Sequence, residues 1–494
     1  MKIRALLTCL VLAIPLEAKG AAPDEATLGQ IDKTFADWRL SAQAPGLAYG
    51  IVADGKLVHV NTLGVRDLES KRPVTPDSRF RIASMSKAFT ALAILKLRDE
   101  GLVSLDAPAE NYVPEMKQWR YPTTDSPKIT VRNLLTHTAG LVEDNPWGDR
   151  QQVVPETGFS EMLRAGVPFS RAPGLAMEYS NFGYATLGRI VTNVSRQPYQ
   201  EYIRREIMLP LGMTSSGFDV FASPQASRAI GYRWENSRWV REPDMKDGSF
   251  GAMGGIETTA ADYSKWVVFL LSAWPARDGP ETGPVRRSTV REIVTGANFA
   301  AGTNRNATLG PACRVARAYG MGWQIADDCD LGQIVSHGGG YPGYGSIVML
   351  LPDKGVGVFA FSNRTYGGPA LPASRALMAL NKAGLLQESP FAISPGLATA
   401  YAAARAVWAN GDIRSAPLAN NVLMDRDAAA WKTKLSDLKK ESGACNLSEP
   451  IKPISAMEGR FTWACETGRI SGRVQRAPTT DVLIQALEFA AAAP

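Results

Sequence analysis

The pattern of apolar and polar positions predicts strands at two places far apart in the chain. A first helix over residues 24–41 is predicted from apolar residues at helical spacing, namely Leu28, Ile31, Phe35 and Trp38. Two apolar runs, residues 46–53 and 56–60, flank Asp54-Gly55, a turn pair typical of a β-hairpin. Strand-like runs return much later, and a helix near residues 369–385 follows them; the runs are 333–336, 345–351 and 356–361.

The segment between these strands, residues 75–330, is interpreted as helix-rich with many Gly and Pro loops. Its clearest helix extends from Arg81 to Leu97, and Gly101 marks its C-terminal stop. The simplest arrangement is one antiparallel sheet built from both ends of the block, flanked by the terminal helices, with a helical subdomain inserted. The predicted fold class is therefore α+β.

The pattern of apolar and polar residues changes after Leu386. Residues 390–395 are predicted to form a linker, residues 397–410 and 425–440 two helices, and the remainder short strands. We therefore predict a main domain over residues 21–388 and a small α+β domain of unknown role over residues 389–494, for which a cystatin-like fold is one option.

The first twenty residues have the pattern of a signal peptide. A basic start precedes an apolar run too short to serve as a permanent membrane anchor, and a small-residue site follows near Gly20/Ala21. Cleavage there predicts a periplasmic or secreted protein, and no other segment indicates a permanent membrane anchor.

Net charge and cysteine content limit the possible functions and cellular locations of the protein further. The net charge is +6, and no basic stripe with interleaved aromatic residues is present, so nucleic-acid binding has little support. Signal cleavage removes Cys9 and leaves an even number of cysteines, which suggests disulfides in an exported chain. The sequence does not fix the connectivity, but two local pairs are available: Cys313 with Cys329, and Cys445 with Cys465.

Ser84 and Lys87 lie three residues apart at the start of the predicted helix. Residues at this spacing share a helix face, so the hydroxyl and the amine can come within hydrogen-bond distance. A buried lysine has a lowered pKa and can accept the serine proton, which makes a nucleophile and base pair. The spacing alone is weak evidence, because the same pattern recurs at Ser436 and Lys439 in a charged stretch interpreted as a solvated helix.

Two further segments carry candidate chemistry. Tyr179 and Asn181 can supply a proton-transfer group and an amide that orients the substrate. A run of glycines after His337 leaves backbone N–H groups open to an oxyanion. The sequence contains no G-x-S-x-G, no H-E-x-x-H and only three histidines, so we expect neither a metal site nor a cofactor.

Taken in order, these segments resemble the serine β-lactamase and penicillin-binding family, which includes class C β-lactamases, DD-peptidases, D-aminopeptidases and related esterases. Its three motifs are matched by Ser84-Met-Ser-Lys87, Tyr179-Ser-Asn181 and His337-Gly-Gly339. The resemblance covers residues 24–385 and also includes these segments: Leu134-Leu-Thr-His-Thr-Ala-Gly-Leu141, Gly254-Gly-Ile-Glu-Thr-Thr-Ala-Ala-Asp262 and Ser362-Asn-Arg-Thr-Tyr366.

The resemblance implies a β-lactamase/transpeptidase-like fold and a role for each motif residue. Ser84 would form an acyl-enzyme, and Lys87 and Tyr179 would share the proton transfers, with the identity of the base left open. Asn181 would orient the lysine and the substrate, and the N–H groups of Ser84 and Gly340 would form the oxyanion hole. His337 would line the pocket beside Tyr179, and Gly338, Gly339 and Gly340, on or beside a strand, would belong to the substrate and oxyanion site. His137 would be structural.

His337 departs from the class C β-lactamases, which have a lysine there that helps to hold the substrate carboxylate. A largely neutral histidine binds an anion less well at pH 7. The expected function is therefore that of a serine hydrolase acting on a small-molecule or peptide substrate, as a D-amino-acid peptidase or an esterase. A β-lactamase and a non-catalytic penicillin-binding receptor are the alternatives.

Overall fold

The computed structural model describes residues 23–145, 147–388 and 391–492. The expected signal peptide and the first residue of the expected linker lie outside these ranges. The chain divides into two compact units, which we describe separately: residues up to Ser272 with Thr282–Gln387, and Ala273–Glu281 with Glu388 onward. Within the described ranges, no helix combines the length and the hydropathy needed to cross a bilayer.

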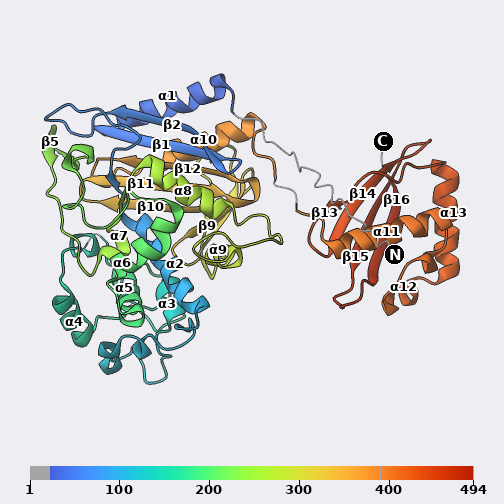
Figure 1. The fold of residues 1–494 in the computed structure, drawn as a ribbon, viewed down its shortest axis with the longest axis horizontal. Helices are drawn as coiled ribbons and strands as arrows, with labels where there is room; N and C mark the ends of the chain where they lie inside the picture. The colour runs from blue at the N-terminus through green and yellow to red at the C-terminus, as the bar shows by residue number, and fades with distance from the viewer. Residues whose placement is uncertain (1–22, 146, 389–390, 493–494) are drawn as a thin grey trace, which may run out of the picture. The chain divides into compact units, whose positions relative to one another are not determined.

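The first unit is built on an eight-stranded antiparallel sheet in which the two ends of the unit meet (Figure 1). The predicted hairpin is present as β1 and β2, and β1 pairs with β12 from the far end of the unit. In spatial order the strands are β2 (Lys56–Gly64), β1 (Gly46–Ala53), β12 (Val356–Ser362), β11 (Tyr344–Leu351), β10 (Gly332–Tyr341), β9 (Gln324–Asp328), β8 (Arg314–Tyr319) and β7 (Asn298–Asn304).

Both faces of the central strands are covered, as the alternation along β12 shows. Val358 and Ala360 belong to the core formed with α1 (Glu25–Ser41) and α10 (Ala370–Lys382). Phe359 and Phe361 point the other way and pack against Tyr263 of α8 (Ala260–Leu271). Because successive side chains of a strand alternate between faces, a fully buried strand such as β12 is apolar throughout.

The inserted segment supplies most of the helices of this unit, and α2 packs against α5 and α7 within it. The helices are α2 (Ser86–Asp99), α3 (Val131–Leu135), α4 (Glu156–Ala165), α5 (Asn181–Ser195), α6 (Tyr199–Ile203), α7 (Gly251–Gly254), α8 (Ala260–Leu271) and α9 (Arg287–Ile293). Two small ribbons complete it: β3 (Phe80–Arg81) with β6 (Glu257–Thr258), and β4 (Tyr232–Glu235) with β5 (Arg238–Arg241).

The structure corrects the sequence interpretation in two places and agrees with it in a third. Strands β7, β8 and β9 lie inside the segment interpreted as helix-rich, so the sheet extends beyond the predicted strands. The glycine run after His337 agrees with its expected place on or beside a strand, because it is part of β10 and pairs with β11. Finally, α2 begins at Ser86, and Ser84 lies just before it in a 3-10 turn, Ala83–Met85.

In its described residues, the second unit has three α-helices, a short 3-10 helix (Ile413–Ser415) and one antiparallel sheet. The helices are α11 (Pro395–Asn410), α12 (Asn420–Asp425) and α13 (Ala428–Ser442), and the strands, in spatial order, are β13 (Lys452–Pro453), β14 (Glu458–Ala464), β15 (Arg469–Arg476) and β16 (Ile484–Ala492). Its own core joins α11 to the sheet through aromatic residues, among them Trp408, Phe461, Trp463 and Phe489. Ser436 of the second S-x-x-K pattern is exposed on α13.

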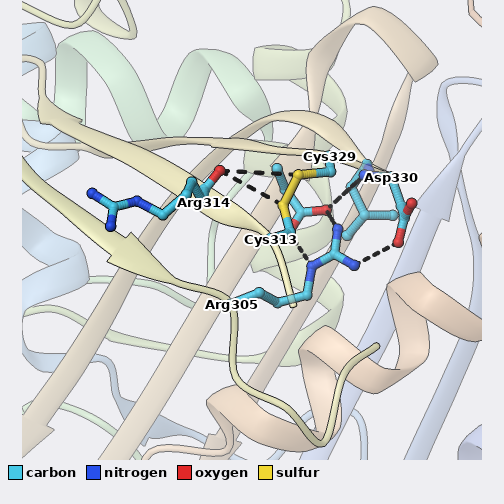
Figure 2. The surroundings of a disulfide bond; sticks show 7 residues. Arg305, Cys313, Arg314, Cys329 and Asp330 are labelled. Carbon is cyan, nitrogen blue, oxygen red and sulfur yellow. Dashed lines mark hydrogen bonds and ion pairs between the residues drawn. A yellow bond between two sulfur atoms is a disulfide. The ribbon is translucent and has the colours of Figure 1, made fainter. Parts of the chain in front are cut away.

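Each unit contains one disulfide, and both pair cysteines that are near in sequence. Cys313 and Cys329 join the start of β8 to the end of β9, and Arg305 binds Asp330 beside this bond (Figure 2). Cys445 and Cys465 lie 20 residues apart in sequence, with Cα atoms 3.9 Å apart, at the end of β14. These are the two local pairs that the sequence offers.

Candidate active site

Ser84 lies at the junction between the sheet and the helical region. It follows β3 in the 3-10 turn that precedes α2, where Ala83 adopts a left-handed conformation with φ of 49°. The side chain is 8% exposed and faces a cavity of about 690 Å³. The hydroxyl is therefore reachable by a ligand, although the turn that carries it is buried.

Lys87 is fully buried one turn later, and its amine makes three hydrogen-bond contacts. Nζ lies 3.0 Å from Ser84 Oγ, 2.7 Å from Asn181 Oδ1 and 3.0 Å from the Met253 carbonyl oxygen. The amide and carbonyl oxygens can only accept, whereas the serine hydroxyl can also donate. A neutral amine therefore fits this site, donating its two protons to the oxygens and accepting the Ser84 proton.

Burial lowers the pKa of Lys87 to about 7, against the opposing effect of the negative charges of Asp149 and Asp144. Removal from water disfavours the charged amine more than these acids stabilise it. A substantial fraction of Lys87 is therefore neutral near pH 7, which is the form that can accept a proton.

Asn181 is fixed at the first residue of α5. Ser180 caps the helix by accepting the Gly183 N–H, and the Asp144 carboxylate accepts the backbone N–H groups of Asn181 and Phe182 at 2.7 and 2.8 Å. A carboxylate at a helix N-terminus is stabilised by the unpaired N–H groups there. This cap aims the Asn181 side chain at Lys87.

Tyr179 lies in the loop before α5 and faces the same cavity as Ser84. Burial raises the pKa of its hydroxyl well above the ordinary value, and a hydrogen bond with Ser84 opposes this shift only in part. His137 supports the loop: its ring lies 4.3 Å from the Tyr179 ring, and its Nδ1 accepts the Ser180 N–H at 3.1 Å. Tyr179 is therefore protonated near neutral pH.

His337 lies on β10 opposite Val348 of β11, and its ring centroid is 6.3 Å from that of Tyr179. Its Nε2 contacts the Tyr319 hydroxyl at 3.0 Å, and its Nδ1 contacts the Gly338 carbonyl at 2.6 Å. Burial, reinforced by the positive charge of Lys87, lowers the pKa of His337 to about 3. The ring is therefore neutral at physiological pH.

The glycines of β10 divide into two roles. Gly338 and Gly340 line the cavity, whereas Gly339 packs against the turn that carries Ser84. A Cβ at Gly339 would overlap Ser346 Oγ and the Ile82 carbonyl oxygen. The absence of a side chain at this position therefore lets the Ser84 turn approach β10. The oxyanion hole formed by the Ser84 and Gly340 N–H groups stays a prediction.

Sequence reasoning missed several residues of this cavity. Asp149 and Tyr366 face it, and the Tyr366 hydroxyl donates to Asp149 Oδ2 at 3.1 Å. The remaining residues that it missed are Glu143, Asn145, Met177 and Gln324. Tyr366 ends a segment of the family resemblance, but no spacing rule connects it with Asp149 more than two hundred residues earlier. No group of three or more His, Cys, Asp or Glu side chains that could hold a metal ion occurs in the described ranges.

The chain is similar in sequence and in fold to several known proteins. A sequence profile described as Beta-lactamase matches residues 25–382. Protein flp of Staphylococcus aureus (strain N315) is 30% identical over 337 residues, which is 68% of this chain and 62% of that protein. Penicillin-binding protein 4* of Bacillus subtilis (strain 168) is 25% identical over 328 residues, or 63% of this chain and 66% of that protein.

The fold also resembles the octameric penicillin-binding protein homologue from Pyrococcus abyssi, with a TM-score of 0.61 over 94% of this chain and 99% of that one. At 21% identity this likeness concerns the fold alone. The chain spans less than two thirds of the length of the Staphylococcus protein. With the profile covering most of the chain, the protein belongs to the beta-lactamase family.

Proposed function

We propose that this protein is a serine hydrolase that works through an acyl-enzyme on Ser84. The observation that carries this proposal is the hydrogen-bond arrangement of Lys87: two of its three partners can only accept, so a neutral amine that donates to both has its lone pair left for the Ser84 hydroxyl, 3.0 Å away. With a pKa of about 7, Lys87 is a proton acceptor matched to neutral pH.

Acylation then has a defined course. Ser84 Oγ bonds to the substrate carbonyl carbon while its proton passes to Lys87 Nζ, and the oxyanion is held by the N–H groups of Ser84 and Gly340. The bond to the leaving group breaks as that group receives a proton, for which the Tyr179 hydroxyl is the candidate donor. Tyr179 regains its proton from Lys87, so the amine is neutral again before the second half of the reaction. A water molecule then attacks the ester and gives a proton to Lys87, which passes it to the departing Ser84 oxygen as the carboxylic acid is released.

Lys87 is the better candidate for the base, since the pKa of Tyr179 is raised well above its usual value. A tyrosine that gives up its proton only at high pH is poorly suited to deprotonate serine at pH 7. We therefore propose Lys87 as the base, a choice that the sequence leaves open.

The neutral His337 favours a peptide, amide or ester over a β-lactam as substrate. Class C β-lactamases use a lysine here toward the antibiotic carboxylate, and a histidine with a pKa of about 3 supplies no positive charge. D-amino-acid peptidase and esterase activity are therefore the preferred proposals, and β-lactamase activity is the alternative.

The test is turnover of a chromogenic cephalosporin, a short p-nitrophenyl ester and D-alanyl-p-nitroanilide by the mature protein and by Ser84→Ala. Ser436→Ala is the matched control, because Ser436 has the same sequence spacing to a lysine but is exposed on α13. We expect Ser84→Ala alone to abolish turnover. Activity that survives in Ser84→Ala contradicts the mechanism, and a lasting acyl adduct without turnover supports the receptor alternative.

We also propose that the protein is exported after cleavage near Gly20/Ala21. The two disulfides are compatible with an oxidising compartment. Intact-mass analysis of protein expressed with its own N-terminus in a bacterial host tests this proposal. We expect a chain that begins near Ala21, recovered outside the cytoplasm, whereas a chain that retains Met1 contradicts it.

A further inference from the structure

The side chains around the candidate active site give it a negative character. Glu143 and Asp149 are the acids that line the cavity, and none of the described residues lining it is a lysine or an arginine. His337 is the basic side chain in the lining, and burial keeps it neutral. A substrate with a carboxylate would therefore lie near the side chains of two acids, and no cation among the lining residues would attract it.

Asp149 is the more confined of the two acids. It is 4% exposed and lies in a 3-10 turn, Gly148–Arg150. This turn packs directly against the Asn181 side chain, because a Cβ added at Gly148 would lie only 2.7 Å from Asn181 Cβ. Its Oδ2 accepts the Tyr366 hydroxyl, and it makes no ion pair within the described ranges. A buried carboxylate in a ligand cavity without a cationic partner is a ready counter-ion.

Against the larger effect of burial, the positive form of Lys87 stabilises the charge of Asp149 and lowers its pKa, but the hydrogen bonds of the amine go elsewhere. Its amine is committed to Ser84, Asn181 and Met253, and its lowered pKa leaves much of it uncharged at neutral pH. Arg150, the next residue in the chain, is exposed and does not line the cavity. The negative charge of Asp149 is therefore available to a bound ligand.

We propose that the substrates of this site carry an ammonium group and that Asp149 binds it. The proposal rests on the proposed function, because it places that group beside the Ser84 nucleophile. Glu143 is less suited to the role, since it is exposed to water and its Oε1 already accepts the Asn145 N–H at 3.0 Å. Charge pairs are weakened by water and strengthened by burial, which favours Asp149 as the partner.

Boronic acids test this proposal without knowledge of the natural substrate, because the serine oxygen adds to boron to give a tetrahedral adduct. Two ammonium compounds, 1-aminoethylboronic acid and 3-(aminomethyl)phenylboronic acid, are compared with their uncharged isosteres, isopropylboronic acid and 3-ethylphenylboronic acid. Dissociation constants are measured by calorimetry on the full mature protein and on Ser84→Ala, Asp149→Asn and Glu143→Gln.

We expect at least one ammonium compound to bind ten times more tightly than its isostere in the unchanged protein. Asp149→Asn should reduce that ratio to below three, whereas Glu143→Gln should keep it. Asparagine retains the acceptor for Tyr366, and Asp149→Ser is the second uncharged variant if the amide variant does not fold.

Equal binding of both members of each pair overturns the proposal, as does a preference that persists in Asp149→Asn or disappears in Glu143→Gln. Failure of the proposed function gives a different result: no boronic acid binds, or Ser84→Ala binds them as well as the unchanged protein does. That result contradicts both the role of Ser84 as the nucleophile and the proposed ammonium site.

Discussion

At the scale of single residues, the chemistry of this site depends on burial that shifts proton affinities in opposite directions. Lys87 and His337 are both driven toward their neutral forms, with pKa values of about 7 and about 3. Tyr179 is held protonated by the same cause. One amine therefore stands out as the group that changes protonation near neutral pH and touches the nucleophile.

The activity should accordingly rise with pH through about 7. Below this value Lys87 is protonated, has no lone pair and cannot accept the Ser84 proton; above it the neutral amine is present. The measurement is kcat/KM for an uncharged ester between pH 5 and 9. Because burial also raises the pKa of Asp149 to about 6, the profile is repeated with Asp149→Asn. In that variant the limb should lie at lower pH, because the negative charge of Asp149 raises the pKa of Lys87. A flat profile in the unchanged protein contradicts the role of Lys87.

His337→Gln should keep kcat/KM within about tenfold of the unchanged protein. The neutral histidine contacts the Tyr319 hydroxyl, and a glutamine amide can replace that hydrogen bond without adding charge. Loss of a residue that transfers protons costs about a hundredfold to ten-thousandfold. Steady-state kinetics on the same uncharged ester checks this, with the melting temperature as control for folding; a thousandfold loss in a folded variant would assign His337 to proton transfer.

At the scale of elements, the site depends on how closely the Ser84 turn approaches β10. Gly339→Ala would overlap Ser346 Oγ and the Ile82 carbonyl, so we expect a loss of about 2 kcal/mol in unfolding free energy and most of the activity. Gly338→Ala is the matched control, since its added Cβ would meet nothing closer than 3.9 Å. Urea unfolding and ester turnover measure both effects; equal stability of the two variants would show that this packing is not required.

Turn residues and burial explain which strands could be predicted from the sequence. The hairpin of β1 and β2 was predicted because Asp54-Gly55 separates two apolar runs. Strand β7 was missed because it is largely exposed and its sequence, Asn298–Asn304, has no apolar alternation. An edge strand that buries few side chains leaves no period to detect.

The candidate site was predictable to the extent that local spacing brings groups together. Ser84 and Lys87 are three residues apart, and their contact follows from one turn of backbone. Asp149 meets Tyr366 only because the helical insertion folds back on the sheet. Contacts of that kind depend on tertiary packing, which spacing along the chain does not encode.

At the scale of the whole molecule, two separate hydrophobic cores account for the change in the pattern of apolar and polar residues after Leu386. One core joins α1 and α10 to the sheet of the first unit, and the other joins α11 to the sheet of the second. The amphipathic helices over residues 397–410 and 425–440 could be predicted from the sequence, with α13 beginning three residues later than expected. The order of the strands they cover could not, because strand pairing is a long-range choice.

Separate cores predict separate unfolding, and the disulfides allow this to be tested. Replacing Cys445 and Cys465 by alanine removes a constraint on the unfolded chain between residues 20 apart, which corresponds to a loss of about 3 kcal/mol. We expect calorimetry to show one transition at lower temperature and the other unchanged, with ester turnover at 25 °C unaffected, since every candidate site residue lies in the first unit. The matched double variant of Cys313 and Cys329 should lower the other transition instead. If either variant shifts both transitions together, the two units unfold as one cooperative structure, and the second core stabilises the site from a distance.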